Sequence, residues 1–194
     1  MSCGEQSTGS SPTSASPLSS GSPLNYFRAN DCVDQPSGSR TAPLGDNFHV
    51  VVRVPSGWTK VPPHPTETEL LGLDAPSGYS NQPTRIQVLS LMGYFQTETV
   101  DQLAQQYYSP SYHENVPSGQ LVGTVTDCPV AGEPAAFFQY IQGNVSGYLV
   151  IFLHFHYLYG LRLEGAGGLD PQAARDAKRI LGSWEWTITT PPSR

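Results

Sequence analysis

The sequence predicts an α+β fold, in which a mostly antiparallel β-sheet is flanked by helices. Three observations lead to this prediction. Several short segments alternate apolar and polar residues with the period of a β-strand. Two segments, 97–108 and 170–182, instead place their apolar residues on one helical face. The chain also contains 19 glycines and 18 prolines, which favour turns, and only 13% of its residues are charged.

The strands are predicted from this alternation and from the turns that bound them. Residues 48–54 alternate, and the P-S-G turn at 55–57 ends that strand. The prolines of 61–65 predict a loop, because proline cannot donate to a sheet. The sequence G-N-V-S-G at 143–147 predicts a hairpin turn. The expected strands are 48–54, 69–75, 84–93, 120–126, 135–142, 148–155, 157–165 and 184–188.

Both helices carry start and stop signals. Thr97 is the expected N-cap of the first helix, and Pro110 stops it. Asp170 is the expected cap of the second helix, with Pro171 in its first turn. Gly182 ends this helix.

The amino-terminal residues predict a tether. Residues 1–23 are mostly Ser, Gly, Pro and Thr, so they cannot bury enough surface to offset their chain entropy. Residues 24–190 are expected to form one folded domain, and 191–194 a frayed tail. Cys3 heads the tether as in a mature bacterial lipoprotein, and Ser2-Cys3-Gly4 fits the end of a lipobox, whose apolar residues the chain lacks. We therefore expect lipid attachment at Cys3; the alternative is an accidental cysteine in a disordered terminus.

The other two cysteines, Cys32 and Cys128, are expected to form a disulfide if the chain is exported. The alternative is a pair of buried thiols in a reducing compartment. None of the three cysteines forms a C-x-x-C, which excludes a zinc ribbon or a thioredoxin motif.

Charge and hydropathy exclude several partners. The formal net charge of −6 argues against nucleic acid and against docking on an anionic bilayer through Lys and Arg. No run reaches the roughly 18 to 20 apolar residues that a membrane span needs. The most apolar stretch, 148–161, contains two histidines and is better explained by adjacent buried strands.

Two motifs resemble those of a known family. The strand ending in V-P-S-G-W at 54–58 and the C-terminal helix running into G-S-W at 182–184 resemble the PsbP-like fold, over about residues 44–190. With Cys3 and the tether, the chain looks like the LpqN/LpqT type of actinobacterial lipoprotein. The resemblance implies an α/β/α sandwich and a non-enzymatic role in docking or stabilising partners. Photosystem and Ran-binding functions are not carried over, because no residue set here supports them.

His154 and His156 form the strongest candidate for a metal site. In a strand, alternation would put both imidazoles on one face, and such a pair often begins a zinc or copper site. One alternative is two histidines on the less buried face of a core strand, which pack against aromatic side chains and are hydrogen-bonded to neighbouring residues; another is a pH switch. A third ligand would have to come from His64, His113, Glu114 or Glu164.

Aromatic residues suggest a ligand or partner surface. Adjacent pairs on a strand put one ring on each face, so that one ring fills the core and the other lies elsewhere. The alternative is an ordinary core with partly exposed tyrosines. The surface is expected to consist of Tyr107, Tyr108, Tyr112, Phe137, Phe138 and Tyr140.

These features favour a lipid-anchored, extracytoplasmic accessory protein that is not an enzyme. It would bind an envelope protein or an apolar envelope ligand, with no cofactor. The alternatives are a small envelope hydrolase or metal enzyme that uses His154 and His156, and a secreted toxin-like or immunity module. Support for a hydrolase is thin, because the chain has no G-x-S-x-G elbow, and a phosphate-binding P-loop is also absent.

Overall fold

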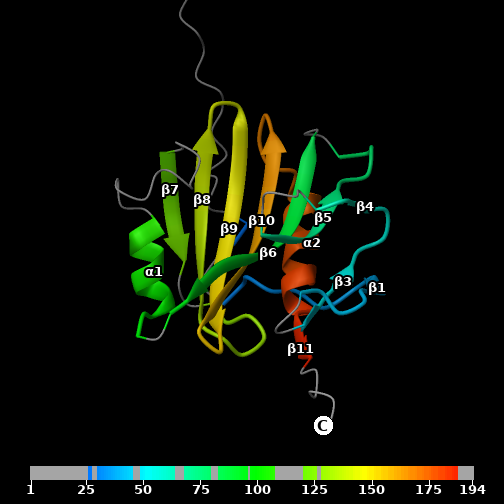
Figure 1. Cartoon of the computed structure of the whole chain (residues 1–194). Coiled ribbons are helices and arrows are strands. Elements are labelled where there is room, and N and C mark those ends of the chain that lie inside the picture. The colour runs from blue at the N-terminus through cyan, green and yellow to red at the C-terminus, as the bar shows by residue number, and fades with distance from the viewer. Residues whose placement is uncertain are drawn as a thin grey trace, which may run out of the picture.

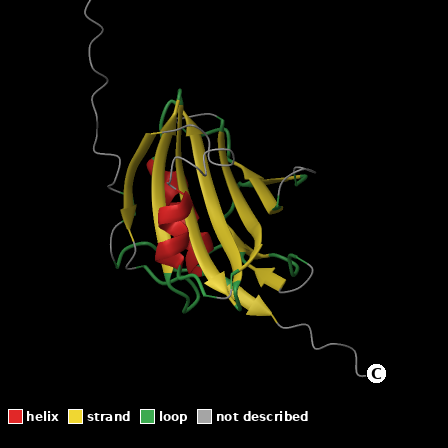
Figure 2. Ribbon diagram, turned by 60° about the vertical axis from the view of Figure 1, so that its left-hand side comes forward, coloured by secondary structure: helices red, strands yellow, loops and turns green. Residues whose placement is uncertain are grey.

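The computed structural model describes residues 26–27, 30–45, 49–63, 68–79, 83–95, 97–107, 120–125 and 128–187. Within these residues, one antiparallel sheet has seven strands in the order β4-β5-β6-β10-β9-β8-β7 (Figure 1). Figure 2 shows the same sheet from another side, with its strands splayed relative to one another. The strands are β4 (Thr59–Val61), β5 (Glu69–Asp74), β6 (Thr84–Tyr94), β7 (Gln120–Val125), β8 (Ala135–Gln142), β9 (Val145–His154) and β10 (Tyr157–Ala166).

Two small ribbons lie outside this sheet. β1 (Ser39–Arg40) pairs with β3 (Arg53–Val54), and β2 (His49–Val51) pairs with β11 (Glu185–Thr187). The prediction of one continuous strand over 48–54 is therefore wrong. Val52 lies between β2 and β3, where its carbonyl accepts from Thr41 N and its amide donates to Thr41 Oγ1. The chain changes partner at this residue, so the alternating pattern is shared by two short strands.

The two helices lie on opposite faces of the seven-stranded sheet. Helix α1 (Val100–Tyr107) packs on β8 and β9, and α2 (Pro171–Gly182) packs on β10 (Figure 1). Asp170 caps α2 as predicted, because its carboxylate accepts from Gln172 N and Ala173 N. The predicted N-cap of α1 is wrong. Thr99 rather than Thr97 caps it, since Thr99 Oγ1 accepts from Gln102 N and Gln102 Oε1 accepts from Thr99 N in a capping box.

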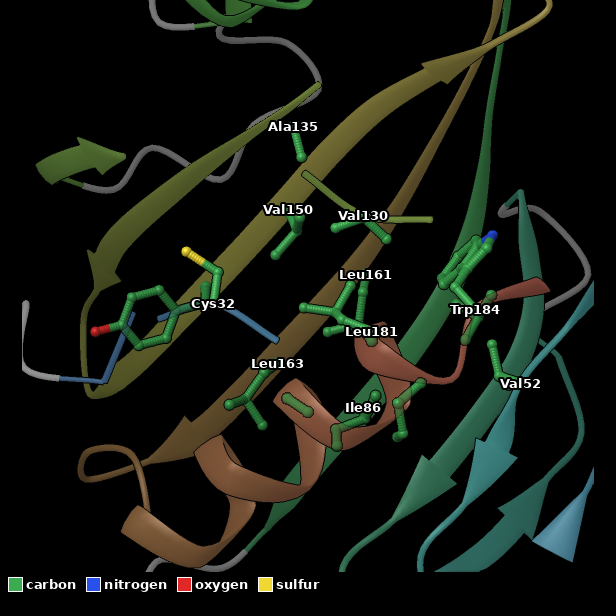
Figure 3. Close-up of a cluster of buried hydrophobic side chains, with 14 of the residues drawn as sticks. Cys32, Val52, Ile86, Val130, Ala135, Val150, Leu161, Leu163, Leu181 and Trp184 are labelled. Carbon is green, nitrogen blue, oxygen red and sulfur yellow. The ribbon is translucent and has the colours of Figure 1, made fainter. Parts of the chain in front are cut away.

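Each face of the sheet therefore has its own core. On β9, Val150 and Phe152 belong to the core under α2, whereas Leu149 and Ile151 belong to the core under α1. Figure 3 shows the first core, in which side chains of the sheet and of α2 point toward one another. Antiparallel sheets often leave one face in water. Here both faces are covered over β8 and β9, which explains why these strands are apolar almost without interruption.

A buried carboxylate fixes the V-P-S-G-W turn to α2. Asp176 accepts from Trp58 Nε1 at 2.9 Å and from the Tyr79 hydroxyl at 2.6 Å. It also accepts from Gln172 Nε2 and Arg179 on its own helix. Burial, together with the hydrogen bond to Asp176, raises the pKa of Tyr79 above its usual value. The two motifs that carried the family resemblance thus meet at one carboxylate.

Residues 30–41, which we call the strap, cross α2 and reach β3. Asp34 N donates to Lys178 O at 3.1 Å, and the Asp31 carboxylate is 3.0 Å from Lys178 Nζ. A Cβ at Gly182 would lie 2.0 Å from Asp34 O, so only glycine allows this close approach. The strap is therefore fitted closely to the end of α2.

Candidate functional site

The turn between β9 and β10 has an unusual backbone. Its two residues, Phe155 and His156, have φ values of 46° and 69°. Positive φ at both central residues is the signature of a type I′ turn, for which Asn-Gly or Gly-Gly is strongly preferred. A bulky side chain is uncommon in this region, because its Cβ crowds the backbone. Such conformations persist where the surroundings impose them, and they often occur at functional sites.

Hydrogen bonds and ring stacking hold the turn from both sides. On the β9 side, His154 Nδ1 is 2.8 Å from Glu133 Oε1, and the His154 ring stacks on Trp186 with a centroid distance of 3.8 Å. On the β10 side, His156 Nδ1 donates to Phe95 O at 2.9 Å, and Phe95 N donates to His156 O at 2.9 Å. The strained turn is therefore braced by two other segments of the chain.

The side chain of Phe155, on this braced turn, is largely exposed. Its exposed fraction is 59%, above the 42% of Val33 and the 38% of Ile141, the other exposed large apolar residues of the described chain. Partly buried Phe95 and Leu153 belong to the α1 side of the sheet, and Tyr157 belongs to the α2 side. The neighbours of Phe155 in the chain thus contribute to both cores. An exposed aromatic ring on a braced turn is suited to enter an apolar site, since an aromatic side chain loses little conformational entropy on binding.

The predicted metal pair is not a shared site. His154 ends β9, whereas His156 lies exposed in the turn, so the two imidazoles do not follow strand alternation and that prediction is wrong. The physical reason is that the strand ends one residue earlier than the sequence indicated. Glu164 pairs with Gly147, at the other end of the β9–β10 ladder, and accepts from the Tyr140 hydroxyl. His64, His113 and Glu114 lie outside the described residues, among which no group of three His, Cys, Asp or Glu side chains could hold a metal.

The predicted aromatic surface is only partly described. Phe137, Phe138 and Tyr140 are 1%, 0% and 4% exposed, so their rings are not available on the surface. Phe137 fills the core under α2 and Phe138 the core under α1, because both faces of the sheet are covered. For these three residues, the expectation of an exposed ring is wrong. The other residues of the expected surface are not described: Tyr108, Tyr112 and the side chain of Tyr107 lie outside the described residues.

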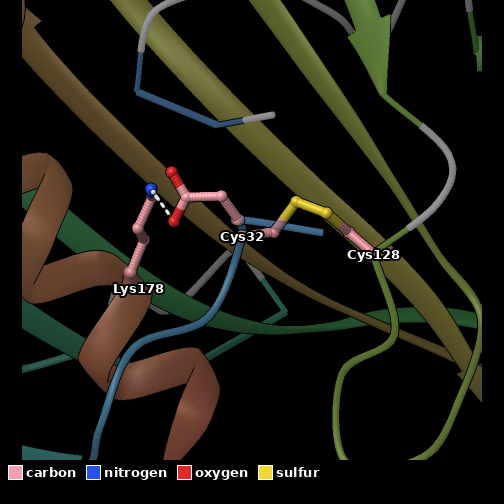
Figure 4. Close-up of a disulfide and its surroundings, with 4 residues drawn as sticks. Cys32, Cys128 and Lys178 are labelled. Carbon is pink, nitrogen blue, oxygen red and sulfur yellow. Dashed lines mark ion pairs between the residues drawn. A yellow bond between two sulfur atoms is a disulfide. The ribbon is translucent and has the colours of Figure 1, made fainter. Parts of the chain in front are cut away.

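A disulfide joins Cys32 of the strap to Cys128 before β8, the pairing expected from the sequence (Figure 4). Both cysteines are 2% exposed, and they are 96 residues apart in the chain. The Asp31–Lys178 ion pair lies beside the bond. Cys3, the predicted site of lipid attachment, lies outside the described residues.

Phe155 was missed by reasoning from the sequence. L-H-F-H-Y contains no Gly, Asn, Asp or Pro, so no turn signal separates β9 from β10, and Phe155 was placed inside a strand. One signal was present. The apolar run from Tyr148 to Leu161 is too long for one ordinary strand, so a turn had to lie within it.

Comparisons with known proteins give a likeness of fold. No protein-family model and no curated protein matches the chain. Among solved structures, cyanobacterial PsbP (CyanoP) of Synechocystis sp. PCC 6803 is similar with 10% identity and a TM-score of 0.47, over 78% of this chain and 97% of that one. LpqN of Mycobacterium tuberculosis, which is involved in cell envelope biogenesis, is similar with 16% identity and a TM-score of 0.47, over 84% of this chain and 98% of that one.

A third structure, from Bacteroides thetaiotaomicron, is similar with 13% identity and a TM-score of 0.43 over 72% of this chain. The chain spans 45% of the length of that protein. At identities this low, a likeness concerns the fold alone. The sequence resembles the same two kinds of protein, PsbP-like and LpqN-type.

Proposed function

We propose that this chain is an extracytoplasmic accessory protein that acts by binding a partner rather than by catalysis. Phe155 at the β9–β10 turn is the contact that the partner covers. The observation that carries the proposal is the exposure of this ring, 59%, on a turn whose backbone is strained and braced. A folding constraint alone would be better met by Asn-Gly at these two positions. Isolated apolar residues are common on protein surfaces, but they rarely occupy such a backbone.

The disulfide supports a location outside the cytoplasm. Buried disulfides form and persist in oxidising compartments, and they are rare in the reducing cytosol. The Cys32–Cys128 bond is buried and closes a long loop, as structural disulfides do. Among the residues that the structure describes, no helix is both long and apolar enough to cross a bilayer.

The proposal includes a lipid anchor at Cys3. The support is the sequence Ser2-Cys3-Gly4 followed by a Ser, Gly, Pro and Thr stretch, which is the composition of a flexible tether. Two or more acyl chains on one cysteine would hold the protein stably at a membrane, whereas one chain would not. The tether would let Phe155 reach partners a few nanometres from the bilayer.

The binding role is tested in the cell that produces the protein. The envelope is solubilised in mild detergent, and the size of the complex that contains this chain is measured by native electrophoresis. The wild-type protein is expected in a complex, and the Phe155→Ser variant as the unbound chain. Ile141→Ser is the matched control, because Ile141 is also exposed and pairs with Ser146 near the opposite end of β9. A complex that is unchanged in Phe155→Ser would refute the proposed contact.

The anchor is tested separately by mass spectrometry of the denatured chain expressed with its native leader. The peptide that contains Cys3 is expected to carry acyl chains, and Cys3→Ser is expected to release the protein from membranes. An unmodified Cys3 peptide would remove the anchor from the proposal and leave the binding role intact.

A further inference from the structure

The charges of the chain are distributed unevenly along the sequence. Between Arg85 and Arg162 there is no lysine or arginine, although the chain contains 10 in total. The same stretch contains several carboxylates: Glu98, Asp101, Glu114, Asp127 and Glu133. Because this stretch carries carboxylates and no lysine or arginine, its formal charge is negative.

Most described residues of this stretch belong to α1 and to adjacent strands of the sheet. The stretch forms most of β6, then α1, β7, β8 and β9, and it includes the turn that holds Phe155. Figure 1 shows α1, β7, β8 and β9 together on the left, and β1, β3, β4 and β5 on the right. Two described cations border the stretch, Arg85 on β6 and Arg162 on β10. The others lie outside it, three on α2 and one each on β1, β3 and β4: Arg175, Lys178, Arg179, Arg40, Arg53 and Lys60.

One carboxylate lies near the exposed ring. Glu133 contacts His154, whose ring centroid is 4.4 Å from that of Phe155. A second, Glu98, lies three residues along the chain from Phe95, which is hydrogen-bonded to His156. The Glu133 side chain is 32% exposed, and Asp101 in the first turn of α1 is exposed. Phe155 is therefore an exposed apolar side chain in a part of the sequence that carries carboxylates and no lysine or arginine.

We propose that the partner is a protein whose contact surface for the ring is apolar and bordered by lysine or arginine side chains. This inference rests on the proposed function and specifies the partner's chemistry. An apolar ring in a pocket contributes most of the binding energy at a small contact. Carboxylates around it steer a cationic surface into place and repel an anionic one. An anionic bilayer would meet the same carboxylates, so the observations favour a protein over a membrane surface.

Two synthetic peptides and one vesicle test this inference with the full chain. One peptide alternates leucine and lysine, the second alternates leucine and glutamate, and the vesicle is pure phosphatidylglycerol. Wild-type protein is expected to bind the leucine–lysine peptide and neither other probe. Binding is expected to weaken at least about fivefold between roughly 50 mM and 500 mM NaCl, because salt screens surface charges.

Matched variants distinguish the contribution of the Phe155 ring to binding from the contribution of the carboxylates. Phe155→Ser is expected to weaken binding at least about tenfold, and Ile141→Ser to leave it unchanged. Asp101→Asn is expected to weaken binding about twofold, whereas Asp74→Asn, which removes an exposed carboxylate from β5, has no effect. Melting curves of each variant check that the fold is retained.

The outcomes distinguish this inference from the proposed function. Three results would overturn the inference that the partner surface is basic. They are equal binding of both peptides, binding to the phosphatidylglycerol vesicles, and binding that does not depend on salt. If the envelope complex also depends on Phe155 but persists at high salt, the binding role stands and only the charge inference fails. If the complex does not depend on Phe155, both fail.

Discussion

Removal of the disulfide tests how the strap is held in place. We consider the double variant Cys32→Ala with Cys128→Ala, because alanine avoids burying a hydroxyl group at two positions that are 2% exposed. The bond joins residues 96 apart, and the loop-entropy relation for a loop of this length gives about 4.7 kcal/mol of stabilisation at 25 °C. The free energy of unfolding is expected to fall by about 3 to 5 kcal/mol, because loss of the sulfur packing adds to the effect and residual structure in the unfolded chain reduces it.

The assay is equilibrium unfolding in urea, followed by tryptophan fluorescence and by circular dichroism. Trp58 and Trp184 are buried, so their emission reports loss of the core under α2. The midpoint is expected to decrease. The slope is expected to increase, because an unfolded chain without the cross-link exposes more surface. Wild-type protein kept in reductant is the control, and its midpoint is expected to approach that of the double variant.

Two results would refute this reasoning. A loss below about 1 kcal/mol would mean that the 96-residue loop is already closed in the unfolded ensemble by other contacts. Separate transitions for fluorescence and circular dichroism would mean that the strap detaches before the sheet unfolds, and a single free energy would then not apply.

Three further predictions concern the Asp176 carboxylate, its partner Tyr79 and the strained turn. Asp176→Asn is expected to lower the pKa of Tyr79, measured by ultraviolet titration, and to cost about 2 kcal/mol in urea unfolding, because charge-assisted hydrogen bonds are lost. The raised pKa means that wild-type protein loses stability as the pH rises above about 10, the usual value for tyrosine; Tyr79→Phe is expected to reduce that loss. Replacing Phe155 and His156 by Asn-Gly is expected to stabilise the chain by about 1 kcal/mol and to abolish the complex, since relief of two positive-φ positions exceeds the loss of one hydrogen bond. An unchanged or lower melting temperature would show that the turn stores no strain.

Local sequence signals predicted most of the large sheet. Expected strands 69–75, 84–93 and 135–142 correspond to β5, β6 and β8, because alternation and flanking turn residues are local properties. The second helix was predicted for the same reason, from Asp170 and Pro171 to Gly182. The ribbons β1–β3 and β2–β11 were not predicted, because they depend on pairing partners up to 138 residues apart, such as Thr187 and His49.

The candidate site could not be predicted, because its features arise from contacts between distant segments. His154 pairs with Glu133 and stacks on Trp186, whereas His156 bonds to Phe95. These contacts impose a positive φ on residues that do not favour it alone. The sequence therefore has no local turn signal at Phe155. The metal pair of His154 and His156 was predicted because both residues were treated as part of one strand.

By itself, the sequence determined the α+β class, the hairpin turn at 143–147 and a stretch without lysine or arginine, and it favoured the Cys32–Cys128 pairing that the structure shows. These follow from composition and from periods of two and 3.6 residues, which are properties of the local chain. Only the tertiary structure decided that both faces of the sheet are covered, which buries Phe137 and Phe138 together. It also decided that Phe155 is exposed, because burial depends on which segments meet in space, and a single strand does not specify that.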